Sequence, residues 1–374
     1  MKKNVFKIFS VLFSFVIVFA AFSFIGCGGE NAGGDGGNGG TGGTGGETSN
    51  ALEIKYYNQG SDLLPMLISG RETIGLLPEP AASTLEKRTA GVTWYRLSLQ
   101  QLYDSEEKAY PQAVLMIKSS VLEEYPEIFT AFSKKTVENV EWAKSNTAEA
   151  VAAVKSLFAN TTLTAESMTS QVIDNCKIYF QSAADGKESV NAYIDDIRSI
   201  YSASANVVNN DFYYSDASGA SEAVLTGENT IAKNNNESFD SGKTLSVYAP
   251  DGAPALAIAK FINDSYDLGT GVSVGYNIVK SDEIGSAMAQ AKGDIIIMPV
   301  SAATKMYAAG NNQSDPYKLA AVMTHGNFYI MSTENITLND LKGKRIGVPN
   351  RGQVPDWTFQ SVLNKNDITF TVAD

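Results

Sequence analysis

Histidine and cysteine are nearly absent from this chain of 374 residues, which has one histidine, His325, and two cysteines, Cys27 and Cys176. A structural zinc site needs about four His or Cys ligands and a catalytic zinc about three, so one copy of the chain cannot assemble either. A Ser–His or Cys–His nucleophile would have to use His325. Two cysteines form one disulfide at most, so the stability of the fold must come from its core. The sequence predicts no metal, no cofactor and no catalytic residue.

Basic residues are also scarce, with 29 Lys and Arg against 41 Asp and Glu, a formal net charge of −12. The first 26 residues hold three lysines and no acid, so the remainder carries 26 basic and 41 acidic residues, a balance of −15. A surface this acidic repels phosphate backbones, which argues against nucleic acid as a partner. Hydrophobic residues make up 44% of the sequence and aromatic residues 10%. This composition and length are typical of a globular protein with two domains.

The N-terminus has the pattern of an export signal. Three lysines precede an uncharged, mainly apolar run of 18 residues, 8–25, and Gly26 stands before Cys27. These features describe a secretory signal peptide, here residues 1–26. A cysteine after the small residue resembles the bacterial lipoprotein signal, in which the cysteine is lipidated, although Phe24 stands where Leu or Val is usual. The alternative is an uncleaved membrane anchor, since 18 apolar residues nearly span a bilayer.

Residues 27–50 follow as a glycine-rich tether. Residues 28–50 contain 12 glycines and no apolar side chain larger than alanine, so burial there cannot repay the entropy of ordering. As a flexible coil the segment has a root-mean-square reach of roughly 26 Å. We therefore expect an extracytoplasmic protein, in the periplasm or at the cell surface, anchored in a bacterial membrane through lipid on Cys27.

Strands and helices alternate from Leu245 onward. The expected strands are residues 245–250, 272–281, 294–300 and 318–332, and the expected helices between them are residues 253–267, 282–293 and 301–310. This alternation predicts βαβ units on a parallel sheet, that is, a doubly wound α/β lobe. A further strand, helix and strand cover residues 344–350, 355–366 and 368–374, where the chain ends in mid-domain.

The first half of the chain supplies similar elements. The expected strands are residues 52–57, 73–77 and 113–117, the expected helices are residues 61–69 and 81–89, and residues 126–204 are expected to be mainly helical. Residues 215–243, between the halves, are small, polar and rich in Asn and Ser. Such a composition is typical of a linker.

Several segments carry a family resemblance. They are residues 251–261, 293–307 and 341–356, and residues 69–83 followed by 110–127. These segments resemble the solute-binding proteins of ABC importers, and more narrowly the group that includes nitrate, taurine, alkanesulfonate and thiamine-precursor receptors. The likeness spans most of residues 51–214 and 244–374. It implies a two-lobed periplasmic-binding-protein type II fold, a solute between the lobes, and a permease and an ATPase in separate chains.

The halves stand in reversed order relative to this family. There, the stretch resembling residues 244–374 comes first and the stretch resembling 51–214 follows it. Residues 368–374 would then continue naturally into residues 51–57. We therefore predict a circular permutation, with the new ends at a surface connection and residues 215–243 joining the ancestral termini.

This order divides the chain between two lobes. Residues 51–112 plus 343–374 would form lobe 2, and residues 113–214 plus 244–342 would form lobe 1. A monomer in which the halves pair within one chain is the expected state. Two alternatives stay open: halves that pair between chains in a domain-swapped dimer, and a gene that fuses truncated copies.

Open α/β sheets bind ligands beyond the carboxyl ends of their strands, where loops and helix N-termini converge. This rule nominates loops from both lobes as walls of a cleft. The nominated residues are Asp251, Gly252, Ala253, Pro299, Val300, Ser301, His325, Gly326 and Asn327 in one lobe, and Tyr57, Glu79, Asn350, Arg351, Gly352 and Gln353 in the other. Simpler roles exist for some of them: Gly252 and Gly352 suit positive-φ turns, and Ser301 resembles a helix N-cap.

Arg351 bears most directly on the class of ligand. Its guanidinium and the N–H groups of the helix that follows suit an oxyanion, and the resemblance includes anion receptors. Asp356 and Glu79 are expected nearby and disfavour an anion. Glu79, between two prolines, would accept hydrogen bonds from a ring amine or amide, or only from its own neighbours. His325 is expected to be a structural or cleft residue and not a catalyst.

Aromatic side chains provide candidates for stacking on a planar ligand, namely Tyr57, Trp94, Tyr248 and Trp357, although most are expected in the core. The favoured ligand is a small heterocycle of the vitamin-precursor type, with a small oxyanion or sulfonate as the alternative. The leading function is capture of such a solute for an ABC importer. Two other classes stay open: an enzyme on the same fold, and a ligand sensor or adhesin that has lost transport.

Overall fold

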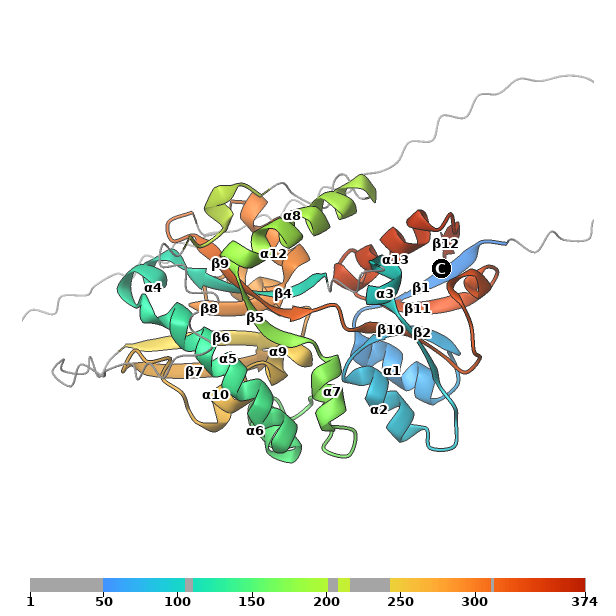
Figure 1. Ribbon diagram of the computed structural model, residues 1–374, viewed down its shortest axis with the longest axis horizontal. Helices are drawn as coiled ribbons and strands as arrows, with labels where there is room; N and C mark the ends of the chain where they lie inside the picture. Colours follow the sequence, from blue (N-terminus) through green and yellow to red (C-terminus); the bar gives the residue numbers. More distant parts are fainter. Residues whose placement is uncertain (1–49, 105–109, 201–207, 216–242, 311–312, 374) are drawn as a thin grey trace, which may run out of the picture. The chain divides into compact units, whose positions relative to one another are not determined.

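The computed structural model of the protein describes residues 50–104, 110–200, 208–215, 243–310 and 313–373. They form two six-stranded β-sheets with helices on both faces of each sheet (Figure 1). The predicted α/β class with doubly wound sheets is therefore confirmed. The predicted signal peptide, Cys27, the tether up to residue 49 and linker residues 216–242 lie outside the described residues. Within the described ranges, no helix has the length and hydropathy needed to cross a bilayer.

The first sheet joins segments from both ends of the chain. Its strands run in the order β12 (Phe370–Val372), β1 (Leu52–Tyr57), β11 (Arg345–Pro349), β2 (Ile74–Pro78), β10 (Phe328–Ser332) and β3 (Tyr95–Ser98). The first four are parallel, and β10 is antiparallel to both of its neighbours. Leu52 and Ile54 on β1 are fully buried, as expected for a strand that lies inside the sheet.

The second sheet combines parallel and antiparallel strands. Its order is β5 (Ile178–Ser182), β9 (Tyr317–His325), β4 (Pro111–Lys118), β8 (Ile295–Pro299), β6 (Thr244–Pro250) and β7 (Ser273–Val279). β6 is parallel to β7 and β8, and β4 is antiparallel to β8 and β9. Val114 and Met116 of β4 belong to one hydrophobic cluster, and Leu115 and Ile117 to another. The strand therefore supplies both faces of the sheet, because successive side chains point to opposite sides.

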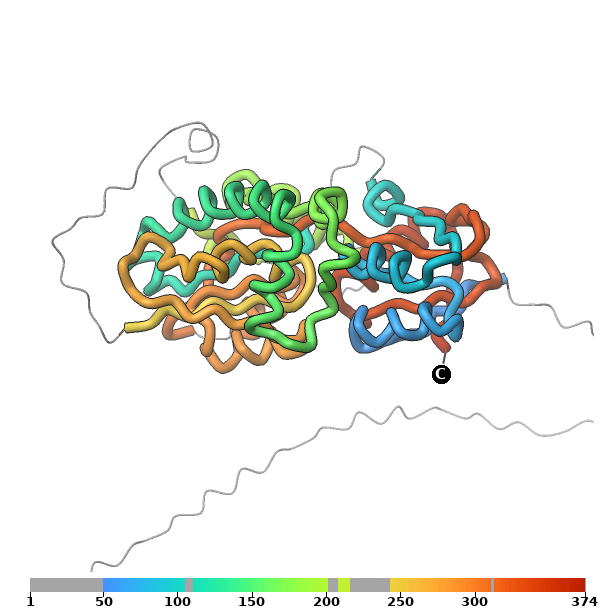
Figure 2. The backbone as a smooth tube through the Cα atoms, turned by 90° about the horizontal axis from the view of Figure 1, so that it is seen from below, coloured from blue at the N-terminus to red at the C-terminus, as the bar shows by residue number. Residues whose placement is uncertain are grey.

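Helices cover both faces of the first sheet. They are α1 (Gly60–Ile68) and α2 (Ala81–Arg88) on one face, and α3 (Leu99–Tyr103), α13 (Val354–Lys365) and the 3-10 helix η2 (Leu338–Leu341) on the other. Leu63 and Leu67 share one side of α1 because they are four residues apart, and they pack in one cluster with Leu77 of β2. In the view from below, α1 and α2, in blue and cyan, lie in front of their strands (Figure 2).

Helices also cover both faces of the second sheet. One face carries α8 (Ala183–Ile200), α11 (Ile284–Ala289), α12 (Val300–Ala308) and the 3-10 helix η1 (Asn210–Phe212). The other carries α4 (Ser119–Glu124), α5 (Glu127–Ser145), α6 (Thr147–Leu157), α7 (Ser170–Asn175), α9 (Ala253–Leu256) and α10 (Ala259–Asn263). In Figure 1, α8 lies above this sheet, α5 crosses in front of its strands, and α6 lies below it.

The chain passes between the two sheets at two places, once from α3 to β4 and once from β9 to β10. These two connections lie side by side. Pro111 pairs with His325 at the start of β4, and the N–H of Gly326 donates to the carbonyl of Tyr110 at 2.9 Å. The crossing is therefore a narrow, hydrogen-bonded pair of strands.

The two segments that the sequence predicts to be consecutive, residues 368–374 and 51–57, are neighbours in the structure but with a different geometry. β12 and β1 are neighbours in the first sheet, and the N–H of Ala373 donates to the carbonyl of Ile54 at 2.8 Å. The strands are parallel, however, and Leu52 lies beside Thr369. Ala51 is then roughly 13 Å along the strand from Ala373. The expectation that residues 368–374 run directly into residues 51–57 is wrong, because the segments lie side by side and not end to end.

The described residues of 126–204 are mainly helical, as predicted, and β5 is a short strand among the helices that pairs with β9 at the sheet edge. Two other expectations need correction. The expected helix 253–267 is two short helices, α9 and α10. The expected strand 318–332 is broken at Gly326, and β10 bonds to β2 and β3 of the first sheet, whereas the predicted boundary at residue 342 placed it in lobe 1. Local patterns do not encode these features, because pairing partners and chain crossings depend on the assembled sheets.

Candidate functional site

A cavity of about 600 Å³ lies at the carboxyl ends of the parallel strands of both sheets. Its wall includes the last residue of five strands: Tyr57, Pro78, Pro250, Pro299 and Pro349. Lys280, which follows β7 directly, also lines it. Loops and helix N-termini converge at this edge of a parallel sheet. The cavity therefore lies where the strand-end rule predicts a ligand site.

Nine of the fifteen nominated residues line the cavity: Tyr57, Glu79, Asp251, Gly252, Ala253, Pro299, Asn350, Arg351 and Gln353. The other six do not: Val300, Ser301, His325, Gly326, Asn327 and Gly352. Gly252 and Gly352 have φ values of 101° and 68°, so their simpler predicted role in positive-φ turns is confirmed. The N-cap prediction for Ser301 is wrong, because α12 begins one residue earlier and its N-cap is Pro299.

Several lining residues escaped the sequence analysis. They are Tyr56, Asn58, Gln59 and Ser61 from the first sheet, and Gln112, Phe158, Asn160, Thr162, Lys280, Ser281 and Asp282 from the second. The strand-end rule could have found Asn58, because it directly follows the predicted strand 52–57. Lys280 lies inside the predicted strand 272–281 and becomes a strand-end residue only because β7 stops at Val279. Phe158 and Asn160 follow a helix, and nothing in their local sequence indicates that they reach a cavity.

Tyr56 and Asp356 organise the wall beneath Arg351. The Tyr56 hydroxyl donates to Asp356 Oδ1 at 2.8 Å, and the N–H of Gly352 donates to Asp356 Oδ2 at 2.7 Å. The Arg351 guanidinium lies 4.7 Å from the centre of the Tyr56 ring, a cation–π contact. Burial raises the pKa of Asp356, although hydrogen bonds from Gly352, Tyr56 and Gln360 oppose that rise. A buried carboxyl group therefore already occupies the N-terminal turn of α13, while the guanidinium stays at the cavity.

The hydroxyl of Tyr57 is bound by a buried carboxylate. The Tyr57 hydroxyl donates to Glu72 at 2.7 Å, and Lys55 reaches the same oxygen at 3.0 Å. The side chain of Glu72 is only 3% exposed, whereas that of Lys55 is 41% exposed. A Cβ added at Gly347 would lie 3.1 Å from the Tyr57 ring and 2.5 Å from Leu63. Glycine at this position therefore makes room for both side chains.

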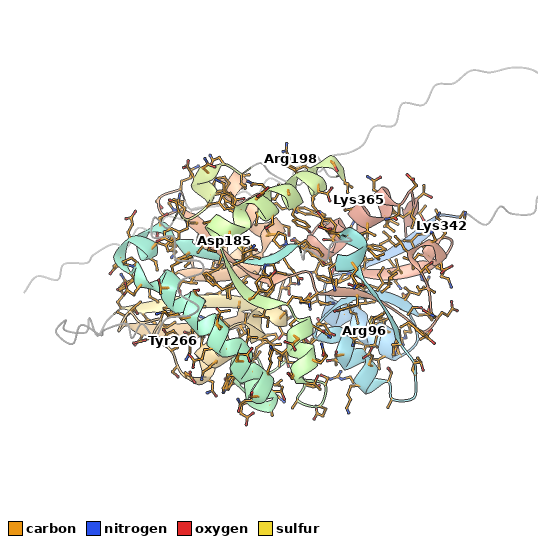
Figure 3. The ribbon with its side chains drawn as sticks, in the orientation of Figure 1. Arg96, Asp185, Arg198, Tyr266, Lys342 and Lys365 are labelled. Carbon is orange, nitrogen blue, oxygen red and sulfur yellow. The ribbon has the colours of Figure 1, made fainter. Side chains whose placement is uncertain are left out.

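Glu79 has its carboxylate satisfied by protein groups. Arg96 donates to Oε1 at 2.5 Å, the Ser83 hydroxyl donates to Oε1 at 3.0 Å, and the Ser83 N–H donates to Oε2 at 3.1 Å. Arg96, labelled in Figure 3, also pairs with Glu86. The Glu79 side chain is fully buried. The Glu79 carboxylate therefore accepts its hydrogen bonds from neighbouring protein groups, which is one of the two roles predicted for it.

Asp251 is likewise committed to the protein. Its carboxylate accepts hydrogen bonds from the Thr161 hydroxyl at 2.5 Å, and from the N–H and hydroxyl of Thr162 at 2.9 and 3.1 Å. The carboxylate therefore fixes the loop after α6, which brings Phe158, Asn160 and Thr162 to the cavity.

In the part of the chain that the structure describes, the exposed charged side chains of the cavity form no hydrogen bonds to protein groups, unlike the carboxylates of Glu79 and Asp251. Within the described ranges, neither Arg351 nor Lys280 forms an ion pair, and Asp282 forms none either. Arg351 and Lys280 come from opposite sheets, after β11 and β7. Charged side chains with unused donors are suited to bind an anionic group.

His325 and its neighbours lie at the strand crossing. The His325 ring stacks on Tyr179 with centroids 3.5 Å apart, and its Nε2 lies 3.2 Å from Gln181 Oε1. Burial lowers the pKa of His325 to about 3, so the imidazole is neutral at physiological pH. Asn327 is fully buried, and its amide donates to the Cys176 carbonyl at 3.2 Å. These residues hold the crossing together and do not reach the cavity wall.

The other three aromatic candidates, Trp94, Tyr248 and Trp357, do not line the cavity. Trp357 is 2% exposed, Tyr248 packs against the main hydrophobic cluster, and the Trp94 ring N–H donates to Thr89 at 2.7 Å. The cavity wall instead carries Tyr56 and Phe158 in addition to Tyr57. No group of three or more His, Cys, Asp and Glu side chains suited to a metal ion occurs in the part of the chain that the structure describes.

No known protein-family profile matches the chain. No curated protein sequence matches it. Among solved structures it is similar to the ABC transporter substrate-binding protein CtaP from Listeria monocytogenes, with 10% sequence identity and a TM-score of 0.27. The match covers 72% of this chain and 52% of that protein, so the chain spans about half of its length. The function therefore has to be inferred from the cavity itself.

Proposed function

We propose that the protein is an extracytoplasmic solute-binding protein that captures one small molecule between its two sheets for an ABC importer. The observation that carries this proposal is the cavity, because two separate sheets contribute strand ends to one space of about 600 Å³. Sites for small molecules typically enclose about 300–1,000 Å³ and combine apolar walls with a few polar groups. Here Pro, Ala, Phe and Tyr form the walls, and Asn, Gln, Lys and Arg supply the polar groups.

The two sheets are proposed to be the cores of two lobes. Residues 51–112 and 343–374, with β10 added, make lobe 2, and the rest of residues 113–342 makes lobe 1, apart from the linker. Residues that contact the ligand from both lobes stabilise the closed arrangement more than an open one, which couples binding to closure. A circularly permuted gene order is part of this proposal. The adjacency of β12 and β1 supports the permutation. Because the two strands are parallel and lie side by side, an ancestral chain would have needed a crossover connection from the end of β12 to the start of β1.

Two ligand classes follow from the sequence, a vitamin-precursor-like heterocycle and a small oxyanion or sulfonate. The anionic class is supported by Arg351 and Lys280, which carry unused donors, and by the internally satisfied carboxylates of Glu79 and Asp251. Among the described residues, the unpaired carboxylate of Asp282 in the same lining opposes an anion, so two cations face one such carboxylate. A planar ring would have to displace Arg351 from the face of Tyr56 before stacking there. An anion would bind the guanidinium without breaking that contact.

Attachment and partners complete the proposal. Lipid on Cys27 would hold the protein at a bacterial membrane, and a permease and an ATPase in separate chains would receive the solute. Catalysis is not proposed, because the carboxylates of Glu79 and Asp251 are engaged in internal hydrogen bonds and His325 is buried at the strand crossing. A sensor or adhesin without transport is the competing class.

Native mass spectrometry of the protein purified from its own source tests the proposal, since it reports oligomeric state and retained ligand together. We expect a monomer with one small molecule. The melting temperature of the protein is then measured with increasing nitrate, methanesulfonate or an aminopyrimidine. The compound that raises the melting temperature identifies the ligand class. Chemical conversion of a probe would favour an enzyme. An empty cavity and no shift in melting temperature with any small molecule would favour the sensor or adhesin.

A further inference from the structure

We infer that Ser301 and Lys305 form a latch between the two sheets that holds the loop carrying Arg351 in its binding position. The two residues are four apart on α12, so they lie on one side of that helix. Neither lines the cavity. They are positioning residues, and the inference rests on the proposed function of the cavity.

The latch consists of two hydrogen bonds to one loop of the first sheet. The Ser301 hydroxyl donates to Gln353 Oε1 at 2.7 Å, and the Lys305 ammonium donates to the Gly352 carbonyl at 2.9 Å. Gly352 directly follows Arg351 in the chain. A contact that fixes the backbone at Gly352 therefore also fixes the position of the Arg351 backbone, from which the side chain reaches the cavity.

The loop is held from its own side as well. The N–H of Asn350 donates to the Tyr57 carbonyl at 2.9 Å, and the N–H of Gly352 donates to Asp356. Gly352 has its N–H bonded within the first sheet and its carbonyl bonded to α12 of the second. The peptide groups around Arg351 are thus clamped only while both sheets are together.

Lys305 is suited to this task by its surroundings. Its ammonium lies 4.9 Å from the centre of the Trp357 ring and, in the described part of the chain, forms no ion pair. Burial lowers the pKa of Lys305, and the field of Asp356 opposes that change. Its partners, the Gly352 carbonyl, the Trp357 ring and the Asp356 carboxyl, all belong to the first sheet. Opening the cavity would therefore break the hydrogen bond to Gly352 and the contact with Trp357, and it would return the ammonium to water.

A conformational measurement without ligand tests the latch directly. Nitroxide labels on Lys87→Cys of α2 and Ala148→Cys of α6, both exposed positions, report the distance between the two sheets in a full chain with Cys27→Ser. We expect Lys305→Met to shift the distances toward longer values and Lys305→Arg to restore them. Ser301→Ala should give a smaller shift in the same direction.

Binding gives the second readout. With methanesulfonate as the probe, Lys305→Met should raise the dissociation constant roughly tenfold and Ser301→Ala roughly threefold, mainly through faster release. Lys318→Met is the matched control, because Lys318 donates to the Asp211 carbonyl at 2.6 Å within the second sheet only. That variant should change neither the distances nor the affinity.

The two readouts separate the latch from the proposed function. If methanesulfonate fails to bind but the distances lengthen in Lys305→Met, the latch stands and the ligand class is wrong. If the distances in Lys305→Met and Ser301→Ala equal those in Lys318→Met, the latch does not exist, whatever binds in the cavity.

Discussion

Gly326 lies against Tyr110, and its N–H donates to the Tyr110 carbonyl at 2.9 Å where the chain crosses between the sheets. A Cβ at residue 326 would lie 2.6 Å from a ring atom of Tyr110. The ring cannot move aside easily, since Tyr110 stacks on Tyr193 with centroids 5.6 Å apart and meets Tyr103 edge-on. The side chain of Tyr110 therefore requires glycine at this crossing.

Gly326→Ala is predicted to destabilise the protein by about 2 kcal/mol, because the added methyl group forces the tyrosine cluster apart. Urea unfolding at neutral pH measures the change. Gly285→Ala is the control, since nothing lies within 4 Å of its added Cβ and the residue is in helix α11. Equal stability of the two variants would show that the crossing is not tightly packed.

Ile368→Ala is predicted to cost about 2–3 kcal/mol and Val372→Ala less than about 0.5 kcal/mol. Both residues are β-branched and belong to the last segment of the chain, but Ile368 is 4% exposed and Val372 is 42% exposed. Ile368 packs in a hydrophobic core cluster just before β12, whereas the side chain of Val372 is exposed on the edge strand β12 itself. Equal, small effects would mean that β12 is not docked. A loss that depends on protein concentration would indicate that β12 is exchanged between two chains.

Asp264 is predicted to make stability depend on pH. Burial acts to raise its pKa, but hydrogen bonds from Lys135, Asn263 and Lys260 outweigh burial and lower the pKa to about 2. Tyr266, labelled in Figure 3, covers the same network, with Lys135 4.9 Å from its ring centre. A depressed folded-state pKa stabilises the protein above the unfolded value, and this stabilisation is lost as pH falls from about 4 to 2.

Asp264→Asn should therefore lower the free energy of unfolding by roughly 1–2 kcal/mol at pH 6, allowing for solvent screening. The difference from the unsubstituted protein should shrink as the pH falls toward 2. Unfolding in urea at several pH values measures both curves. A difference that stays constant from pH 6 to pH 2.5 would assign the effect of the substitution to packing and not to charge.

Arg351→Ala is predicted to weaken methanesulfonate binding roughly 10- to 100-fold and not to weaken the binding of a neutral aminopyrimidine. The guanidinium supplies charge-assisted hydrogen bonds only to the anion. Titration calorimetry measures both ligands. Lys342→Ala removes an exposed positive charge outside the cavity lining and controls for net charge. Unchanged affinity for the anion would remove Arg351 from the site.

Some of the site could be predicted from local sequence. Asp251 and Asn350 stand at the cavity because each follows a buried, regularly patterned strand, and strand ends are visible in sequence. Ser301 and Gly352 were nominated by the same rule but bind protein groups across the cavity edge. Whether a strand-end residue meets ligand or protein depends on the partner that the opposite sheet presents, and that partner is far away in sequence.

The sequence by itself determined the α/β class, the alternation of most strands and helices, and the edge of the sheets at which a cavity forms. These features follow from hydrophobic periodicity, which is a local property of the chain. The tertiary structure alone decided that β12 lies beside β1 and not before it, that β10 crosses to the first sheet, and that Glu79 and Asp251 are engaged internally. Each of these depends on hydrogen bonds between residues distant in sequence, whose pairing is fixed only when both sheets have assembled.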